Sequence, residues 1–344
     1  MTMQETQAPV LLVPYAWIGD FVRCHSVVQL LTARWPERPV DILSSTLCAP
    51  LAAYMPGVRK AVVHDLPRRR LAYAEHARLA AKLAPEHYGT ALVMSRKWKA
   101  ALAPYLAGIP ERVGFLGEMR LLLLTDIRPG EKQYNTMAEQ CTALALPRGA
   151  KLPPLPEPKL AASDAQRKSW RARTGIEKGG KRAVALAPGS VWLSKRWPLS
   201  HYARLAALLA ERGYAVWVAG GRDEKPLAEA IRVSVPAARD LTGLDLGDGA
   251  LALGEADAAV SNDSGALHMA AAFGTPTLAL FGPTDPAAWM PLNKSARALL
   301  ADEPLDCRPC AAHDCPLGHH KCLVDLAPQA VLAEVERALA HSRS

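Results

Sequence analysis

Short apolar runs separated by amphipathic stretches recur along the whole chain. In the first half, mostly apolar runs occur at Val10–Val13, Val40–Leu43 and Thr90–Met94. Runs of this length are typical of parallel strands that are buried on both faces. Between them, Phe21–Arg34 and Leu71–Leu83 have the periodicity of helices. The pattern predicts an α/β domain with a doubly wound parallel sheet.

The same alternation resumes in the second half. The predicted strands are Ala183–Ala187, Tyr214–Ala219, Ala256–Val260 and Thr277–Phe281, and the predicted helices are Ala161–Arg173, His201–Glu211, Glu224–Val233 and Pro328–Ala340. Between the halves, Leu146–Pro158 contains five prolines in thirteen residues. Proline interrupts helices and central strands, so this segment is predicted to link two Rossmann-like domains, residues 1–158 and 159–344.

Composition is consistent with two ordinary domains. Half of the 344 residues are apolar and 22% are charged, which allows each domain its own core. No apolar stretch approaches the length of a membrane-spanning helix, and the first ten residues lack the pattern of a secretory signal. We therefore expect a cytoplasmic protein whose seven cysteines are thiols or metal ligands rather than disulfides.

The positive charge of the chain is concentrated in its first half. The net charge is +8, and residues 59–99 alone contain ten basic and three acidic residues. This surplus predicts an anionic partner for the first domain, although a solvated basic face is the alternative. The candidate partner-binding residues are Arg68, Arg69, Arg70, Arg96 and Lys97.

The turn after Ala256–Val260 is a candidate phosphate site. Asp263, Ser264 and Gly265 are short residues that suit a helix N-terminus, where free backbone N–H groups attract anions. His268 follows one helical turn later. Turns at the carboxyl ends of neighbouring parallel strands are where open α/β sheets hold ligands. The alternatives are a capping role for Asp263 and a core role for His268.

Two further turns follow predicted strands of the second half. Ser190 lies in a Gly-Ser turn, and Lys195 precedes the next predicted helix, so both suit a phosphate unless Lys195 is only a solvated charge. Glu224, or its neighbour Asp223, could bind ribose hydroxyls. The chain has no dinucleotide-binding glycine fingerprint and no Walker A motif, which disfavours an NAD-dependent oxidoreductase and an ATPase.

Asp20 is the candidate catalytic residue. It follows the first predicted strand in the segment Trp17–Asp20, where a carboxylate could accept the proton of an attacking hydroxyl. The alternative is that Asp20 only caps a helix that begins at Phe21.

Four cysteines and three histidines gather near the C-terminus. The cysteines are Cys307, Cys310, Cys315 and Cys322. The first pair has the spacing of a zinc half-site, but six residues separate the second pair. Packed reduced thiols are favoured, with structural zinc and disulfides as alternatives, so no metal site is predicted.

Four segments, in order along the chain, resemble glycosyltransferase family nine, the bacterial heptosyltransferases. They are residues 17–20 (Trp-Ile-Gly-Asp), 187–198 (beginning Ala-Pro-Gly-Ser and ending Lys-Arg-Trp-Pro), 262–284 (beginning Asn-Asp-Ser-Gly and ending Phe-Gly-Pro-Thr) and 307–322 (ending Cys-Pro-Leu-Gly-His-His-Lys-Cys). The last ending is especially similar to the ADP-heptose:lipopolysaccharide heptosyltransferases of the family.

The resemblance implies a GT-B fold, two Rossmann-like domains that face a cleft, and an inverting transfer without a metal or cofactor. It implies that the second domain binds ADP-heptose through Lys195, Ser264 and Gly265, and that Asp20 is the general base. The first domain would bind the anionic inner core of lipopolysaccharide, with peripheral contact to the inner membrane and no nucleic acid. Open alternatives are a different sugar or acceptor and, in another class, a basic zinc-containing nucleic-acid-binding protein.

Overall fold

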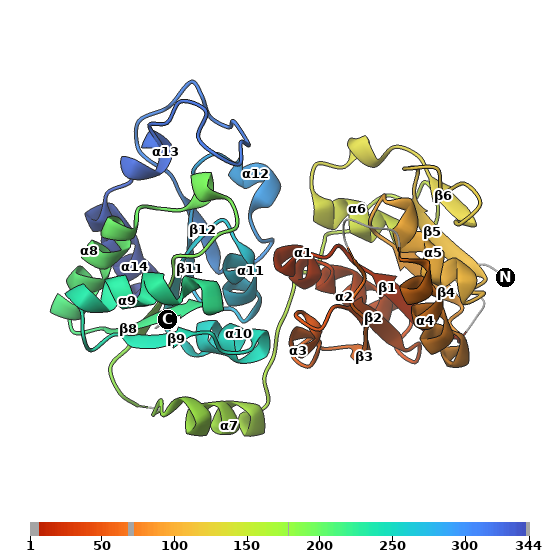
Figure 1. Cartoon of the computed structure of the whole chain (residues 1–344), viewed down its shortest axis with the longest axis horizontal. Coiled ribbons are helices and arrows are strands. Elements are labelled where there is room, and N and C mark those ends of the chain that lie inside the picture. The colour runs from red at the N-terminus through yellow and green to blue at the C-terminus, as the bar shows by residue number, and fades with distance from the viewer. Residues whose placement is uncertain (1–6, 68–71, 178, 342–344) are drawn as a thin grey trace. The chain divides into compact units, whose positions relative to one another are not determined.

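The computed structural model describes residues 7–67, 72–177 and 179–341 and divides the chain into two compact units, residues 1–158 and 159–344 (Figure 1). Unit 1 contains a six-stranded, fully parallel sheet in the order β3-β2-β1-β4-β5-β6. Its strands are β1 (Val10–Val13), β2 (Val40–Ser44), β3 (Val58–Val63), β4 (Thr90–Val93), β5 (Glu111–Phe115) and β6 (Asp126–Arg128). Its helices are α1 (Ile18–Arg23), α2 (His25–Arg34), α3 (Ala49–Ala52), α4 (Tyr73–Leu83), α5 (Trp98–Leu106) and α6 (Met137–Leu144).

Unit 2 repeats this topology with a second parallel sheet in the order β12-β11-β10-β7-β8-β9. Its strands are β7 (Ala183–Ala187), β8 (Ala215–Gly220), β9 (Arg239–Thr242), β10 (Ala258–Asn262), β11 (Thr277–Leu280) and β12 (Ala296–Leu299). Its helices are α7 (Asp164–Thr174), α8 (Leu199–Glu211), α9 (Lys225–Ser234), α10 (Leu246–Glu255), α11 (Gly265–Ala272), α12 (Pro286–Trp289), α13 (Lys321–Val324) and α14 (Pro328–His341). Counted from its own first strand, each sheet has the Rossmann-like strand order 3-2-1-4-5-6, so the doubly wound α/β prediction is confirmed.

The central strands were predicted and the edge strands were not. β3, β6, β9 and β12 form the four sheet edges, and none of them is an uninterrupted apolar run. An edge strand has one side open to solvent, so charged residues are tolerated there and the apolar signal is lost. β5 was also missed, because it begins with Glu111 and Arg112.

The helix after β1 differs from its prediction. The predicted helix Phe21–Arg34 is two helices that meet at Cys24, and the first begins at Ile18 with Trp17 as its N-cap. Asp20 therefore lies inside the first turn of α1, and the alternative that it caps a helix beginning at Phe21 is wrong. The proline-rich segment has no regular secondary structure, as its composition predicts. Residues 145–163, which the structure describes in full, form neither helix nor strand.

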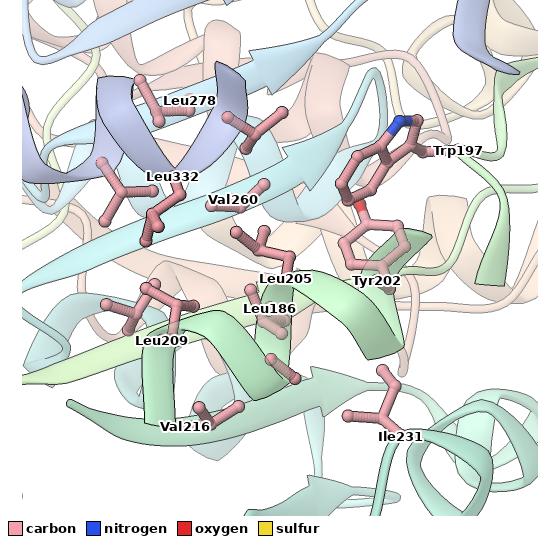
Figure 2. Close-up of a cluster of buried hydrophobic side chains, with 14 of the residues drawn as sticks. Leu186, Trp197, Tyr202, Leu205, Leu209, Val216, Ile231, Val260, Leu278 and Leu332 are labelled. Atoms are coloured by element: carbon pink, nitrogen blue, oxygen red, sulfur yellow. The ribbon is translucent and has the colours of Figure 1, made fainter. Parts of the chain in front are cut away.

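The core of unit 2 fixes the elements that bear the candidate site. Figure 2 shows Leu186, Val260 and Leu278 of the sheet packed against side chains of α8 and α14. Trp197, which precedes α8, is 2% exposed, and its indole N–H donates to the Leu326 carbonyl at 2.9 Å. Its ring lies edge-on to Tyr202 at 4.9 Å. Because Trp197 is buried and hydrogen-bonded, it fixes the C-terminal end of the short segment that contains Lys195.

No helix in the described part of the chain is long and apolar enough to cross a membrane.

Candidate functional site

Two turns meet at the centre of the unit 2 sheet. β7 and β10 are adjacent and parallel, and the strand order runs outward from them in opposite directions. Residues 188–190 follow β7 and residues 263–265 follow β10, so both turns lie at the carboxyl ends of the strands. Such a reversal point is where open α/β sheets hold ligands.

Asn262 ties these turns together. Its side chain is fully buried, and its Nδ2 donates to the Pro188 carbonyl at 2.8 Å. Its Oδ1 accepts from the Trp197 backbone N–H and from the Tyr202 hydroxyl, each at 3.1 Å. One amide therefore sets the β7 turn, the β10 turn and the start of α8. The sequence interpretation gave Asn262 no role, although it is the last residue of a buried strand and directly precedes Asp263.

Lys195 and Asp263 form a buried ion pair beside the turns. Lys195 Nζ lies 2.6 Å from Asp263 Oδ2, and the side chains are 12% and 5% exposed. The Thr284 hydroxyl donates to the same carboxylate oxygen at 2.8 Å. Lys195 Nζ also lies 4.6 Å from the ring centre of Trp192 and 5.3 Å from that of Trp289. The lysine is thus held at the end of the 3-10 helix η3 (Leu193–Lys195). Thr284, Trp192 and Trp289 were not predicted.

The N-terminus of α11 lies directly after Asp263. Ser264 is the N-cap residue in extended conformation and makes no side-chain capping bond. Its hydroxyl instead lies 3.3 Å from that of Ser261. Gly265 begins the helix, and buried His268 lies one turn further. The first N–H groups of α11 are therefore left for another acceptor, and the helix dipole favours an anion there.

Glu224 reaches the turn that follows β7. A Cβ on Gly189 or on Gly220 would overlap the Glu224 side chain, so the two glycines leave room for this carboxylate. It accepts a hydrogen bond from the Gly221 backbone N–H at the start of the 3-10 helix η4 (Arg222–Glu224). Asp223 is exposed. The structure therefore favours Glu224 over Asp223 as the acidic residue beside this turn.

Ser190 completes the group. It is buried, and its carbonyl accepts a hydrogen bond from Arg196 Nε at 2.8 Å, which closes the loop that leads to Lys195. Seven predicted residues thus come from turns or helix starts at the same edge of one sheet: Ser190, Lys195, Glu224, Asp263, Ser264, Gly265 and His268. A cation, a free helix N-terminus and a separate carboxylate can together bind a phosphate group and neighbouring hydroxyls.

Asp20 belongs to unit 1. It is 8% exposed, and its Oδ1 lies 3.7 Å from Arg23 Nη1 one turn along α1. Burial raises the pKa of the nearby Cys141 thiol to about 12, and the charge of Asp20 adds to that rise. The carboxylate therefore lies in a shielded environment at the carboxyl end of β1, in the position that the sequence predicted relative to this strand.

Unit 1 also contains a cavity of about 520 Å³ that the sequence did not predict. It lies at the carboxyl ends of β1, β2 and β4. Its walls are largely apolar, and Ser95, Lys97, Lys99, His64 and His76 supply polar groups.

The predicted basic residues have different surroundings. Lys97 lines the cavity and lies 3.8 Å from Glu118. Arg96 pairs instead with Glu131 at 2.9 Å. Arg68, Arg69 and Arg70 lie outside the described residues.

The C-terminal cysteines surround a small cavity of about 20 Å³. All seven cysteines of the chain are free thiols, so the disulfide alternative is wrong. Among the described residues, no group of three or more His, Cys, Asp or Glu is arranged to hold a metal ion.

The loop that bears these cysteines supports the candidate site. Ser194 Oγ donates to the Ala312 carbonyl at 2.6 Å, and the Ala311 N–H donates to the Pro283 carbonyl at 2.9 Å. The cysteine loop therefore braces both η3, which holds Lys195, and the turn before Thr284.

Comparisons with known proteins agree with this geometry. Residues 76–321 match Glycosyltransferase family 9 (heptosyltransferase). The chain is 33% identical to the lipooligosaccharide heptosyltransferase 2 of Haemophilus influenzae, over 96% of this chain and 99% of that protein. It is 32% identical to the lipopolysaccharide heptosyltransferase 2 of Escherichia coli, over 96% and 98%. The solved Escherichia coli ADP-heptose lps heptosyltransferase II superposes with a TM-score of 0.86 at 30% identity, covering 98% of this chain and all of that one.

These matches confirm the resemblance and the GT-B fold class inferred from the sequence. They extend over nearly the whole chain and include both units. The chain belongs to glycosyltransferase family 9, the heptosyltransferases.

Proposed function

We propose that this glycosyltransferase moves heptose from ADP-heptose to the inner core of lipopolysaccharide. The observation that carries the proposal is the buried Lys195–Asp263 pair beside the free N-terminus of α11. It lies at the reversal point of the unit 2 sheet, in a chain that belongs to a heptosyltransferase family. The proteins it resembles are named for lipopolysaccharide or lipooligosaccharide substrates, which supports the choice of acceptor.

The donor is assigned to unit 2. The diphosphate of ADP-heptose would accept hydrogen bonds from the N–H groups of Ser264 and Gly265 and a charge-assisted bond from Lys195. Glu224, at the neighbouring strand end, would accept from ribose hydroxyls. Asp263 would hold Lys195 in place rather than contact phosphate, because two anions repel. Ser190 and His268 would complete the walls of this donor site.

The acceptor is assigned to unit 1. The Asp20 carboxylate would take the proton of the attacking acceptor hydroxyl. The oxygen then forms a bond to the anomeric carbon of the heptose as the bond to the diphosphate breaks, and ADP leaves with the bonding electrons. Attack from the face opposite to ADP inverts the anomeric configuration. Lys97 and Arg96, with the basic residues at 68–70, would attract the anionic inner core.

In this proposal no divalent metal is needed to stabilise the leaving diphosphate. Lys195 and the α11 dipole would stabilise the negative charge that develops on the leaving diphosphate. We also propose that the protein works at the inner membrane surface without spanning it, and that nucleic acid is not its ligand. The nucleic-acid alternative needs a zinc module, and the described cysteines and histidines form no such group.

Calorimetry with ADP, UDP, GDP and NAD, in EDTA, tests the donor assignment. ADP should bind most tightly, and metal removal should not weaken it. Preference for UDP or GDP would favour the alternative that the enzyme uses another sugar donor. Mass spectrometry of a purified inner-core acceptor after incubation with ADP-heptose then tests the transfer, which should add one heptose.

A further inference from the structure

The loop between β5 and β6 exposes an unusual amount of apolar surface. Within residues 116–122, which we call the leucine loop, Leu116 is 52% exposed, Met119 97%, Leu121 62% and Leu122 87%. Single exposed apolar side chains are ordinary on protein surfaces. Four of them within seven residues concentrate exposed apolar surface in one short loop, as interaction sites do.

This loop is anchored rather than loosely attached. Between the exposed residues lies Arg120, which is 1% exposed. Its guanidinium donates to the Phe115 carbonyl at 3.0 Å from Nε and also to the Ser95 carbonyl. Its own carbonyl accepts from the backbone N–H groups of Leu123 and Leu124, at 3.0 and 3.2 Å. One buried arginine thus fixes the loop from within, so the apolar side chains around it are directed to the surface.

The same loop adjoins basic residues and the cavity wall of unit 1. Gly117 packs against the Arg96 backbone so closely that a Cβ would overlap the Arg96 carbonyl. The side chains of Arg96 and Lys97 are 53% and 66% exposed, and Lys97 also lines the cavity. Glu118 and Glu131 pair with these two cations, but residues 1–158 still contain 19 basic and 13 acidic residues.

We propose that the leucine loop inserts into the interfacial region of an anionic lipid bilayer and so holds the unit 1 cavity at the membrane surface. The apolar side chains of the loop suit the acyl chains of the bilayer, and the neighbouring cations suit its anionic headgroups. A protein partner fits less well, because a stable protein interface draws about 20–30 residues from each side and this loop has only seven. The inference rests on the proposed function in one respect: the proposed acceptor, lipopolysaccharide, is anchored in a membrane.

The test is sedimentation of the purified full chain with vesicles of phosphatidylethanolamine and phosphatidylglycerol. The variant is the triple substitution Met119→Ser, Leu121→Ser and Leu122→Ser, which leaves Arg120 in place. The matched control is Val233→Ser with Val324→Ser, which removes exposed apolar side chains from unit 2. We expect the triple variant to bind vesicles about tenfold less tightly or weaker still, and the control to bind like the wild type. Equal melting temperatures would establish that all three proteins are folded.

Several results would overturn the inference. The first is that the wild type does not bind vesicles, and the second is that the control variant loses vesicle binding as much as the triple variant does. The third result is self-association of the wild type that increases with concentration and that only the triple variant lacks. Activity assays separate the inference from the proposed function. The triple variant should turn over a deacylated, water-soluble acceptor normally and a vesicle-embedded acceptor poorly. A wild type that binds vesicles through the loop but transfers heptose to neither acceptor would contradict the proposed function and leave the membrane contact standing.

Discussion

Removing the charge of Lys195 should have two separable effects, one on stability and one on ADP binding. Asp263 is 5% exposed, and its partners in the structure are Lys195 Nζ at 2.6 Å and the Thr284 hydroxyl at 2.8 Å. Lys195→Met keeps the apolar stem beside Trp192 and Trp289 but leaves the carboxylate without its cation. Breaking a buried pair from one side costs about 3–5 kcal/mol of unfolding free energy. We expect the lower end, about 3 kcal/mol, because Thr284 still donates.

The double variant Lys195→Met with Asp263→Asn isolates the binding effect. Asparagine keeps the shape of Asp263 without its charge, so most of the lost stability should return, with a coupling of about 2 kcal/mol between the two sites. ADP affinity should not return, because the phosphate contact of Lys195 is still missing. One charge-assisted bond corresponds to about 1.5–3 kcal/mol, or roughly 10–150-fold in Kd.

Urea unfolding and calorimetry with ADP on the wild type, both single variants and the double variant complete the cycle. Asp263→Asn alone should bind ADP more weakly than the wild type, because it removes the carboxylate that holds Lys195 in place, but more tightly than the two Lys195→Met variants, which lack the cation. Wild-type ADP affinity in the double variant would refute the phosphate role of Lys195. Full stability in Lys195→Met would refute the view that Asp263 depends on this lysine.

Three further outcomes follow from the structure. Asp20→Asn should lower kcat by about 10²–10⁴-fold in a coupled ADP-release assay while ADP affinity and melting temperature stay level, and near-normal turnover would exclude Asp20 as the base. Cys315 should be the first cysteine that iodoacetamide alkylates, as measured by peptide mass spectrometry. Backbone N–H groups, first that of His320, lower the pKa of its thiol, and a thiolate reacts faster than a thiol. Earlier labelling of Cys310 would contradict this. Burial, together with Lys99 and His64, lowers the pKa of His76, so unfolded chains bind a proton near pH 6.5 that the folded chain binds only at lower pH. The free energy of unfolding should therefore fall as pH drops below about 6.5, and His76→Gln should reduce that fall in urea titrations; an unchanged pH profile would argue against this contribution.

The parts of the fold that the sequence predicted are those with strong local signals. Central strands such as β7 and β10 are buried at every position, so β7 is apolar throughout and β10 is apolar up to its last two residues. The turn 263–265 was predicted because short polar residues precede a helix. The edge strands were missed because solvent on one side permits residues such as Arg239 and Asp240 in β9.

The candidate site divides in the same way. Residues in turns next to predicted strands, among them Ser190 and Asp263, could be found because the carboxyl ends of parallel strands share one edge. Asn262 could not, since its importance lies in hydrogen bonds to Pro188 and Tyr202, which are more than 50 residues away in sequence. The same holds for the contact between Glu224 and Gly189, which depends on the absence of a side chain at the glycine.

The loop that bears Cys307, Cys310, Cys315 and Cys322 acts on the candidate site through its backbone. The sequence favoured reduced thiols there over a disulfide, and all seven cysteines are free thiols. The backbone of the loop makes the contact with the site. The carbonyls of Ala312 and His313 accept hydrogen bonds from the hydroxyl and the backbone N–H of Ser194, the residue before Lys195. Alkylation of the exposed Cys310 should therefore weaken ADP binding in calorimetry through this backbone contact, although Cys310 does not lie in the proposed donor site. The loop and the site are thus linked through hydrogen bonds between two segments that lie more than 100 residues apart in sequence.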